Sequence, residues 1–338
     1  MKMKGTNTWI AMTVLVFAVS LLTIPTSQAQ RAAGISRVGW LEICGPAPRR
    51  PNFDIFRGRL AELGYIEGKN LLIEQRFADC QYDLMPGLAA ELVRVPVDVL
   101  FTMGTRASRI VAETVKTTPL VVYTCDPFEH VTRLARGRGN LTGVTCMTTE
   151  LSPKRLELLH EAVPAASRVM FLHDPQAAPN AWKLTQEAAP LLGITLQQAQ
   201  VGAAEELLPE LRMIEKERPD ALFVYPDVVL SSYPRPQQLA EFAIKAQLPT
   251  MNAFRFFTDA GGLMSYGATT SEIYTNAAEQ VAQVLAGARP SEVPLRQATR
   301  FELVINNWTA KTLGITIPPS LLARADEVIE SPPPFATH

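Results

Sequence analysis

Residues 97–127 read VDVLFTMGTRASRIVAETVKTTPLVVYTCDP, and this stretch decides the fold. The runs VDVLF and PLVVY are apolar on successive residues, which is typical of parallel strands covered on both faces. Between them, Gly104 and Thr105 precede a helix that carries Ile110 and Val111. A strand, a helix and a second strand in this order predict one unit of a parallel, doubly wound sheet.

The same alternation extends along most of the chain. Short apolar runs predict ten strands, at residues 38–43, 71–76, 97–102, 120–123, 141–145, 169–172, 195–200, 221–225, 263–266 and 301–305. Amphipathic helices are expected between them, and one helix should end at Gly64, where a C-cap glycine is expected. Ser152-Pro153 predicts an N-cap followed by a first-turn proline, and residues 269–272 (TTSE) predict a capping box. The sequence therefore predicts an α/β fold.

The first thirty residues differ from the rest. Lys2 and Lys4 precede an uncharged apolar run at 9–24, and small residues at Ser27 and Ala29 follow it. This order predicts a secretory signal peptide, residues 1–29, that is cleaved near Ala29. An uncleaved membrane anchor is the alternative interpretation.

Length and charge narrow the class of protein. A chain of 338 residues exceeds the roughly 250–300 residues at which a single core usually stops growing, so two lobes are expected. The chain has 32 basic and 33 acidic residues and no basic stripe, which argues against nucleic acid as a partner. It contains no GxSxG, Walker A or HExxH motif, so we expect neither an enzyme nor a metal or cofactor.

Four cysteines follow the predicted signal peptide: Cys44, Cys80, Cys125 and Cys146. In an oxidising compartment an even number favours disulfides, and four cysteines allow three connectivities. Four free thiols are the alternative.

Four stretches carry a resemblance to a known family. They are FRGRLAELGYIEGKNL (56–71), GNLTGVT (139–145), GGLMSYG (261–267) and FELVIN (301–306). In this order and spacing they resemble the bacterial ABC-transporter substrate-binding proteins of the tryptophan/tyrosine-binding-like family. The resemblance covers nearly all of the chain after the predicted signal peptide, and it implies the type I periplasmic binding protein fold.

That fold implies two Rossmann-like, doubly wound lobes joined by three crossover segments. The crossovers are expected near residues 143–147, 264–267 and 294–301. Lobe 1 would comprise residues 35–145 plus 267–293, lobe 2 residues 148–263 plus 298–330, and residues 331–338 a flexible tail. The strand order 2-1-3-4-5 expected in lobe 1 would bring Cys44 beside Cys80 and Cys125 beside Cys146, and these pairs are the predicted disulfides.

The cleft of such a protein lies at the carboxyl ends of the strands. The candidate ligand-binding residues follow predicted strands: Gly45, Pro46, Gly104, Thr105, Arg106, Thr124, Asp126, Phe128, His173, Asp174, Tyr225, Asp227, Asn252 and Phe254. The helix start at Gly104-Thr105, with Arg106, could hold an anion, although Arg106 could equally be solvated. Asp126 could accept a ligand amino group or cap the next helix. The aromatic candidates could sandwich a flat ligand or pack within a lobe.

The resemblance implies a periplasmic solute-binding component of an ABC importer. Its lobes would close over a small polar solute that can be aromatic, such as an amino acid. The implied partners are a membrane permease and its cytoplasmic ATPase, and a monomer is expected. One alternative function is a ligand-sensing module for a membrane receptor. Another is an exported hydrolase that uses His173 and Asp174, although an adjacent His and Asp after a strand more often form a turn and a cap.

Overall fold

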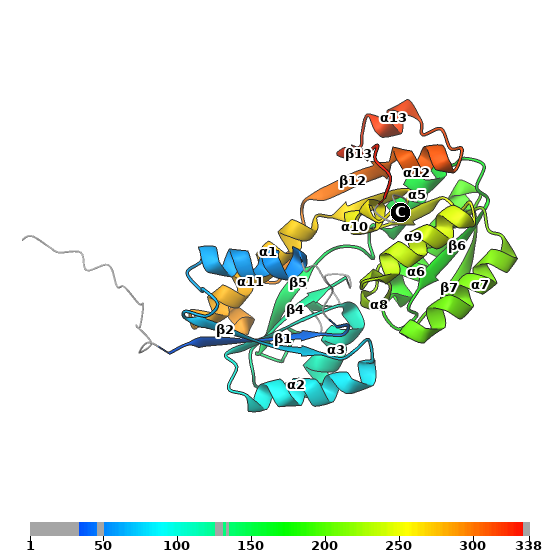
Figure 1. Ribbon diagram of the computed structural model, residues 1–338. Coiled ribbons are helices and arrows are strands. Elements are labelled where there is room, and N and C mark those ends of the chain that lie inside the picture. The colour runs from blue at the N-terminus through cyan, green and yellow to red at the C-terminus, as the bar shows by residue number, and fades with distance from the viewer. Residues whose placement is uncertain (1–33, 46–50, 126–130, 133–134, 334–338) are drawn as a thin grey trace, which may run out of the picture. The chain divides into compact units, whose positions relative to one another are not determined.

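Two sheets form the centre of the computed structural model, which describes residues 34–45, 51–125, 131–132 and 135–333 (Figure 1). Residues 35–338 form one compact unit. The predicted signal peptide, Pro46, Asp126, Phe128 and most of the predicted tail lie outside the described residues. No helix in the described ranges is both long enough and apolar enough to cross a membrane.

Sheet A has the strand order β11-β5-β4-β3-β1-β2, and all its pairs are parallel. Its strands are β1 (Ser36–Glu42), β2 (Leu71–Phe77), β3 (Val99–Met103), β4 (Leu120–Thr124), β5 (Leu141–Thr145) and β11 (Arg296–Gln297). Helices α1 (Pro51–Glu62) and α11 (Thr270–Leu285) share one buried apolar cluster with Val38 and Phe101. Helices α2 (Met85–Arg94) and α3 (Thr105–Thr114) share another with Leu41 and Leu100. Because neighbouring strand residues point to opposite faces, sheet A is covered on both sides.

Sheet B has the order β13-β12-β10-β9-β8-β6-β7 and is parallel except for the pair β10–β12. Its strands are β6 (Arg168–His173), β7 (Thr195–Gln200), β8 (Ala221–Val224), β9 (Thr250–Asn252), β10 (Met264–Ala268), β12 (Phe301–Asn306) and β13 (Glu327–Ile329). Its helices are α5 (Ser152–Ala162), α6 (Pro179–Ala188), α7 (Leu207–Glu217), α8 (Val228–Ser231), α9 (Arg235–Lys245), α10 (Arg255–Asp259), α12 (Asn307–Thr312) and α13 (Pro319–Leu322). Helices α5, α6, α12 and α13 contribute to one apolar cluster, and α7, α9 and α10 to another, so this sheet is also covered on both faces. Four short 3-10 helices complete the described elements: Tyr82–Leu84, Ala189–Leu192, Ala204–Glu206 and Pro290–Glu292.

The predicted fold class is confirmed. All ten predicted strands are present, and sheet A has the expected order β2-β1-β3-β4-β5. The chain passes between the sheets after β5, after β10, where α11 packs on sheet A, and after β11. Strands β9, β11 and β13 were not predicted, because they have only three, two and three residues and no apolar run.

Two predicted helix caps were wrong. Ser152 is the first residue of α5 rather than its N-cap, and its hydroxyl donates to the Thr148 carbonyl. Thr269 is the N-cap of α11 but makes no side-chain cap bond. The Glu272 carboxylate instead accepts from the backbone N–H groups of Thr299 and Arg300. Ser152 therefore bonds back to a carbonyl four residues earlier. Glu272 bonds to groups far along the chain instead of to its own helix start.

Candidate functional site

A cavity of about 890 Å³ lies where the carboxyl ends of strands from both sheets meet. Segments after β3, β4, β8, β9 and β10 all contribute to its lining. Parallel strands end at one edge of a sheet, and binding sites of α/β proteins lie outside that edge. The cavity is therefore the candidate solute site, and its size is typical of small-molecule pockets.

Aromatic side chains form much of the lining. Trp40, which is 1% exposed, stacks on Tyr274 with ring centroids 6.5 Å apart and meets the edge of Phe53 at 5.0 Å. Tyr274 also meets Tyr123 edge-on at 5.7 Å, and its hydroxyl donates to the Met103 sulfur. Such offset and edge-to-face contacts hold the rings in fixed positions. The cavity thus offers rigid apolar surfaces to a flat solute.

Arg106 spans from sheet A to sheet B beside the cavity. It lies in the first turn of α3, and its guanidinium stacks on the Tyr82 ring at 3.8 Å. One nitrogen lies 3.4 Å from the Asp174 carboxylate and donates to the Gly202 carbonyl at 3.2 Å. The side chain of Asp174 is fully buried and that of Arg106 is 19% exposed. The pair is therefore weakly screened by solvent.

Gly104, which precedes Arg106, lies close to Val228 of α8. It has φ of +92°, and a Cβ at this position would lie 2.3 Å from a Val228 methyl group. Only glycine fits both the backbone conformation and the contact.

Asp227 is a buried carboxylate in the cavity lining. It is the N-cap of α8, and its Oδ1 accepts from the Leu230 backbone N–H at 2.9 Å. Its Oδ2 has no hydrogen-bond partner among the described residues. Burial raises the pKa of Asp227 to about 7, and the nearby Asp174 charge acts in the same direction.

Several other charged lining residues have partners. Arg255 donates to Glu327 at 2.9 Å and to Asp259 at 3.3 Å. The Trp40 indole N–H donates to Glu42 at 3.0 Å. Within the described ranges, no three His, Cys, Asp or Glu side chains gather to form a metal site.

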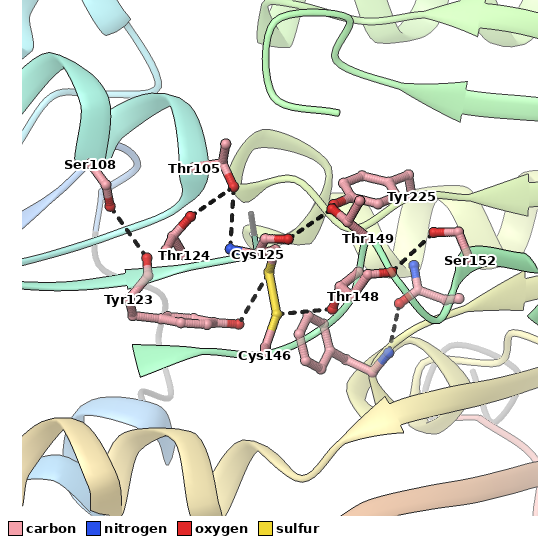
Figure 2. Close-up of a disulfide and its surroundings, with 12 residues drawn as sticks. Thr105, Ser108, Tyr123, Thr124, Cys125, Cys146, Thr148, Thr149, Ser152 and Tyr225 are labelled. Atoms are coloured by element: carbon pink, nitrogen blue, oxygen red, sulfur yellow. Dashed lines mark hydrogen bonds between the residues drawn. A yellow bond between two sulfur atoms is a disulfide. The ribbon is translucent and has the colours of Figure 1, made fainter. Parts of the chain in front are cut away.

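A hydrogen-bonded network connects the cavity to the segment that leaves sheet A after β5 (Figure 2). The Thr105 hydroxyl bonds to the Thr124 hydroxyl and accepts from the Cys125 backbone N–H. Thr149 donates to the Cys125 carbonyl at 2.8 Å and lies 3.0 Å from the Tyr225 hydroxyl. Cavity residues from both sheets are thus held to one crossing segment.

Both predicted disulfides are present. Cys44 pairs with Cys80, with Cα atoms 4.2 Å apart, and Cys125 with Cys146, at 5.2 Å. The second disulfide joins the residues that follow β4 and β5, beside the network above (Figure 2). The described residues include no free cysteine.

The predicted site residues fall into three groups. Seven line the cavity: Gly45, Gly104, Thr105, Arg106, Tyr225, Asp227 and Phe254. Four do not line it: Thr124, His173, Asp174 and Asn252. Asn252 bonds instead to the Val224 carbonyl and the Phe254 N–H. Pro46, Asp126 and Phe128 lie outside the described residues.

Sequence reasoning missed lining residues that do not follow a strand. Trp40 lies within β1, Phe53 in α1 and Tyr274 in α11. Their aromatic character was the only available signal, and core residues carry the same signal.

His173 and Asp174, the pair that the hydrolase alternative would use, do not line the cavity. The His173 ring is 2% exposed and stacks on Trp182 at 6.0 Å. Burial lowers the pKa of His173. Asp174 accepts from the Gln176 backbone N–H, which makes it part of a turn.

The fold and the cavity define the class of protein: a two-sheet α/β protein built to enclose a small solute. A family model described as ABC transporter substrate binding protein matches residues 52–329. The chain therefore belongs to the family of ABC transporter substrate-binding proteins, which are typically exported to the periplasm. The family implies a small-molecule solute and an ABC permease as partners.

Relatives and solved structures agree with this assignment. The chain is 21% identical to a tyrosine-binding protein of Clostridioides difficile (strain R20291) over 274 residues, which are 76% of this chain and 74% of the relative. A conserved domain protein from Vibrio cholerae has a similar fold, with a TM-score of 0.78, 25% identity and coverage of 87% of this chain and 99% of that one. An ABC domain from Streptococcus pneumoniae in complex with L-Trp matches with a TM-score of 0.75, 21% identity and the same coverage.

Proposed function

We propose that this protein is the periplasmic solute-binding component of an ABC importer and that it closes two lobes over a small polar solute with aromatic character, such as an amino acid. The observation that carries the proposal is the aromatic-lined cavity at the carboxyl ends of both sheets. A solute enclosed there would gain affinity from ring contacts and from a few oriented polar groups.

The relatives support the same solute class. One is named for tyrosine, and one structure contains L-Trp. We propose that the seven predicted residues that line the cavity contact the solute. For the full set of fourteen predicted ligand-binding residues, a role in binding remains a proposal.

The remaining parts of the proposal concern export and assembly. We place lobe 1 at residues 35–145 plus 267–293 and lobe 2 at 148–263 plus 298–330. Residues 1–29 would direct export and be removed. The delivered solute would pass to a permease driven by a cytoplasmic ATPase, and the protein would act as a monomer without catalysis of its own.

Thermal unfolding of the exported protein tests this function. The protein is first unfolded and refolded to remove bound solute, and then screened with amino acids, aromatic acids, nucleosides, sugars and short peptides. A solute at 100 times its Kd should stabilise the fold by about 2.7 kcal/mol, which raises Tm measurably. We expect aromatic amino acids to raise Tm.

A matched pair of variants shows where the solute binds. Ser231→Trp adds bulk to the cavity lining, and Ser320→Trp adds the same bulk to an exposed position of α13. The first should abolish the rise in Tm and the second should retain it. A library in which no compound shifts Tm would contradict the proposed function.

A further inference from the structure

The chain crosses between the two sheets three times, and each crossing is short. The first crossing comprises residues 146–151, between β5 and α5, and the second is residue 269, between β10 and α11. The third comprises residues 298–300, between β11 and β12. Closure of two lobes bends the chain at such places, because a few residues at the ends of elements absorb a hinge motion. The contacts that hold the ends of the crossings therefore limit how the lobes can move.

Arg155 of α5 holds the first two crossings on sheet B. Its side chain is 0% exposed, and its guanidinium donates to the Thr148 carbonyl of the first crossing. It also donates to the Tyr266 carbonyl of β10 at 3.2 Å and to the Ser152 hydroxyl at 3.0 Å. The third crossing enters β12, which pairs with β10. Arg155 and this strand pair thus connect all three crossings where they meet sheet B.

The charge of Arg155 serves main-chain oxygens rather than a carboxylate. Burial lowers the pKa of Arg155 to about 10, although the Glu150 charge acts in the opposite direction, so the guanidinium is still protonated at neutral pH. Its hydrogen bonds to described residues all go to carbonyl or hydroxyl oxygens, and its Nε has no partner among them. Arginine is rarely buried without a partner that repays its desolvation. The two carbonyl bonds are therefore what this buried cation provides.

Gln280 of α11 occupies the corresponding place on sheet A. Its side chain is fully buried, and its amide nitrogen donates to the Gly143 carbonyl of β5 at 3.0 Å. The same nitrogen donates to the Pro294 carbonyl, just before β11, at 2.8 Å. The second crossing leads directly into α11, which packs on sheet A. Gln280 thus connects the sheet A ends of all three crossings.

Few residues remain between these two anchors. In the first crossing the chain runs from Gly143, which Gln280 holds, to Thr148, which Arg155 holds. Met147 lies between them and has φ of +55°. A residue other than glycine adopts this conformation at a cost, and such residues gather in segments that switch between arrangements. Neither anchor lines the cavity, so neither can affect binding by touching the solute there.

We propose that Arg155 and Gln280 are positioning residues for closure: each holds the ends of the crossings together on one sheet, so that closure bends only the residues between the two anchors. The inference rests on the proposed function, because it concerns how the lobes close over the solute. Without an anchor the open protein would sample more arrangements, and closure would cost more conformational entropy. Solute affinity should then fall although every residue of the cavity lining is unchanged.

Hydrogen exchange of the solute-free protein tests the anchors without any solute. Arg155→Met keeps an apolar side chain and removes the donors, so the amides of residues 146–151 and 266–269 should exchange at least about tenfold faster. Lys154→Met is the matched control, because Lys154 is the neighbouring residue of α5 and its amine bonds to Glu157 on the exposed surface. Exchange in this control should equal that of the wild type.

Ile214→Ala separates a positioning role from a general loss of stability. Ile214 is 0% exposed and belongs to the apolar cluster of α7, α9 and α10. Its truncation should lower the unfolding free energy through a cavity in that cluster. Exchange should then rise without concentrating at the crossings.

Gln280→Met applies the same test to sheet A. The amides of residues 143–147 and 295–298 should exchange at least about tenfold faster, because the donors to Gly143 and Pro294 are gone. This variant decides the question if Arg155→Met does not fold.

Titration calorimetry measures the effect on binding. The probe is L-tryptophan, or the library compound that raises Tm most if L-tryptophan does not bind. Its Kd should rise by about tenfold or more in Arg155→Met and Gln280→Met, because less of the protein is ready to close. The Kd should be unchanged in Lys154→Met and Ile214→Ala.

The outcomes separate this inference from the proposed function. Exchange at the crossings that is no faster than in Ile214→Ala would overturn the inference, and so would faster exchange with an unchanged Kd. Neither result would affect solute binding by the wild type. If no compound of the wider library bound the wild type, the proposed function would fail, whereas hydrogen exchange would still decide whether Arg155 and Gln280 hold the crossings.

Discussion

At the scale of single residues, Asp227 combines a local and a global role. Locally it caps α8, as its residue type favours. Globally it is buried beside Asp174, and this environment cannot be read from the sequence YPDVVL around it. The folded structure therefore changes its chemistry as well as its position.

The raised pKa of Asp227 predicts how stability depends on pH. Because burial raises the folded-state value from 3.8 to about 7, the folded protein binds this proton more tightly than the unfolded chain. The resulting stabilisation is complete below pH about 4 and is lost as the pH rises through about 7. Without solute, Asp227→Asn should therefore be more stable than the wild type at pH 8, by on the order of a few kcal/mol, and similar to it near pH 4.

Urea unfolding at several pH values measures this difference. The groups that act on Asp227, or respond to its charge, are Asp174, Tyr82 and Arg235, and all three remain in the variant. Asp220→Asn should show no such gain at pH 8, because backbone bonds lower rather than raise the pKa of Asp220. A pH-independent difference between wild type and Asp227→Asn would contradict the assignment.

At the scale of elements, two glycines differ in the space around them: Gly143 is closely packed, and Gly58 is not. A Cβ on Gly143 in β5 would lie 2.2 Å from the Val122 carbonyl oxygen of β4, whereas a Cβ on Gly58 in α1 would have no atom within 4 Å. Gly143→Ala should destabilise the protein by about 1–3 kcal/mol through overpacking. Gly58→Ala should stabilise it by up to about 1 kcal/mol through helix propensity. Chemical denaturation of both variants checks the opposite signs, and a loss of stability in both would refute the packing argument.

Elements were largely predictable from the sequence, and their ends were less so. The apolar runs VDVLF and PLVVY identified β3 and β4, because a strand covered on both faces is apolar on successive residues. The two-residue β11 has no such pattern, since it exists only by pairing with β5. The Glu272 cap failed because residues 299–300, which its carboxylate binds, return from far along the chain.

At the scale of the whole molecule, topology predicted where the candidate site lies but not its full lining. Loops after strands must gather at one edge of each sheet, so Gly104, Tyr225 and Phe254 could be chosen from the sequence. Trp40 and Tyr274 could not, because their exposure to the cavity depends on how α11 packs on sheet A. His173 was chosen because it follows the predicted strand at 169–172, but it is the last residue of β6 and packs against Phe171 and Trp182.

The pair Arg106–Asp174 connects the two sheets, so a substitution of Arg106 should change the stability of the whole molecule. It connects the start of α3 on sheet A to the loop after β6 on sheet B, and Asp174 is fully buried. Arg106→Met keeps an apolar side chain but removes the guanidinium that stacks on Tyr82, and it leaves the Asp174 carboxylate without its cation. The unfolding free energy should fall by about 1–3 kcal/mol, the cost of an unsatisfied buried polar group.

Arg289→Met is the matched control for this prediction. Arg289 pairs with Glu292 within one exposed segment, so its loss should leave Tm unchanged. Small-angle X-ray scattering of solute-free Arg106→Met should also show a larger radius of gyration, because a direct bond between the parts built on the two sheets is gone. Unchanged stability and unchanged scattering would contradict this prediction and would mean that the remaining contacts, such as those of Arg235 with Cys80 and of Gly104 with Val228, hold the two parts together without the ion pair.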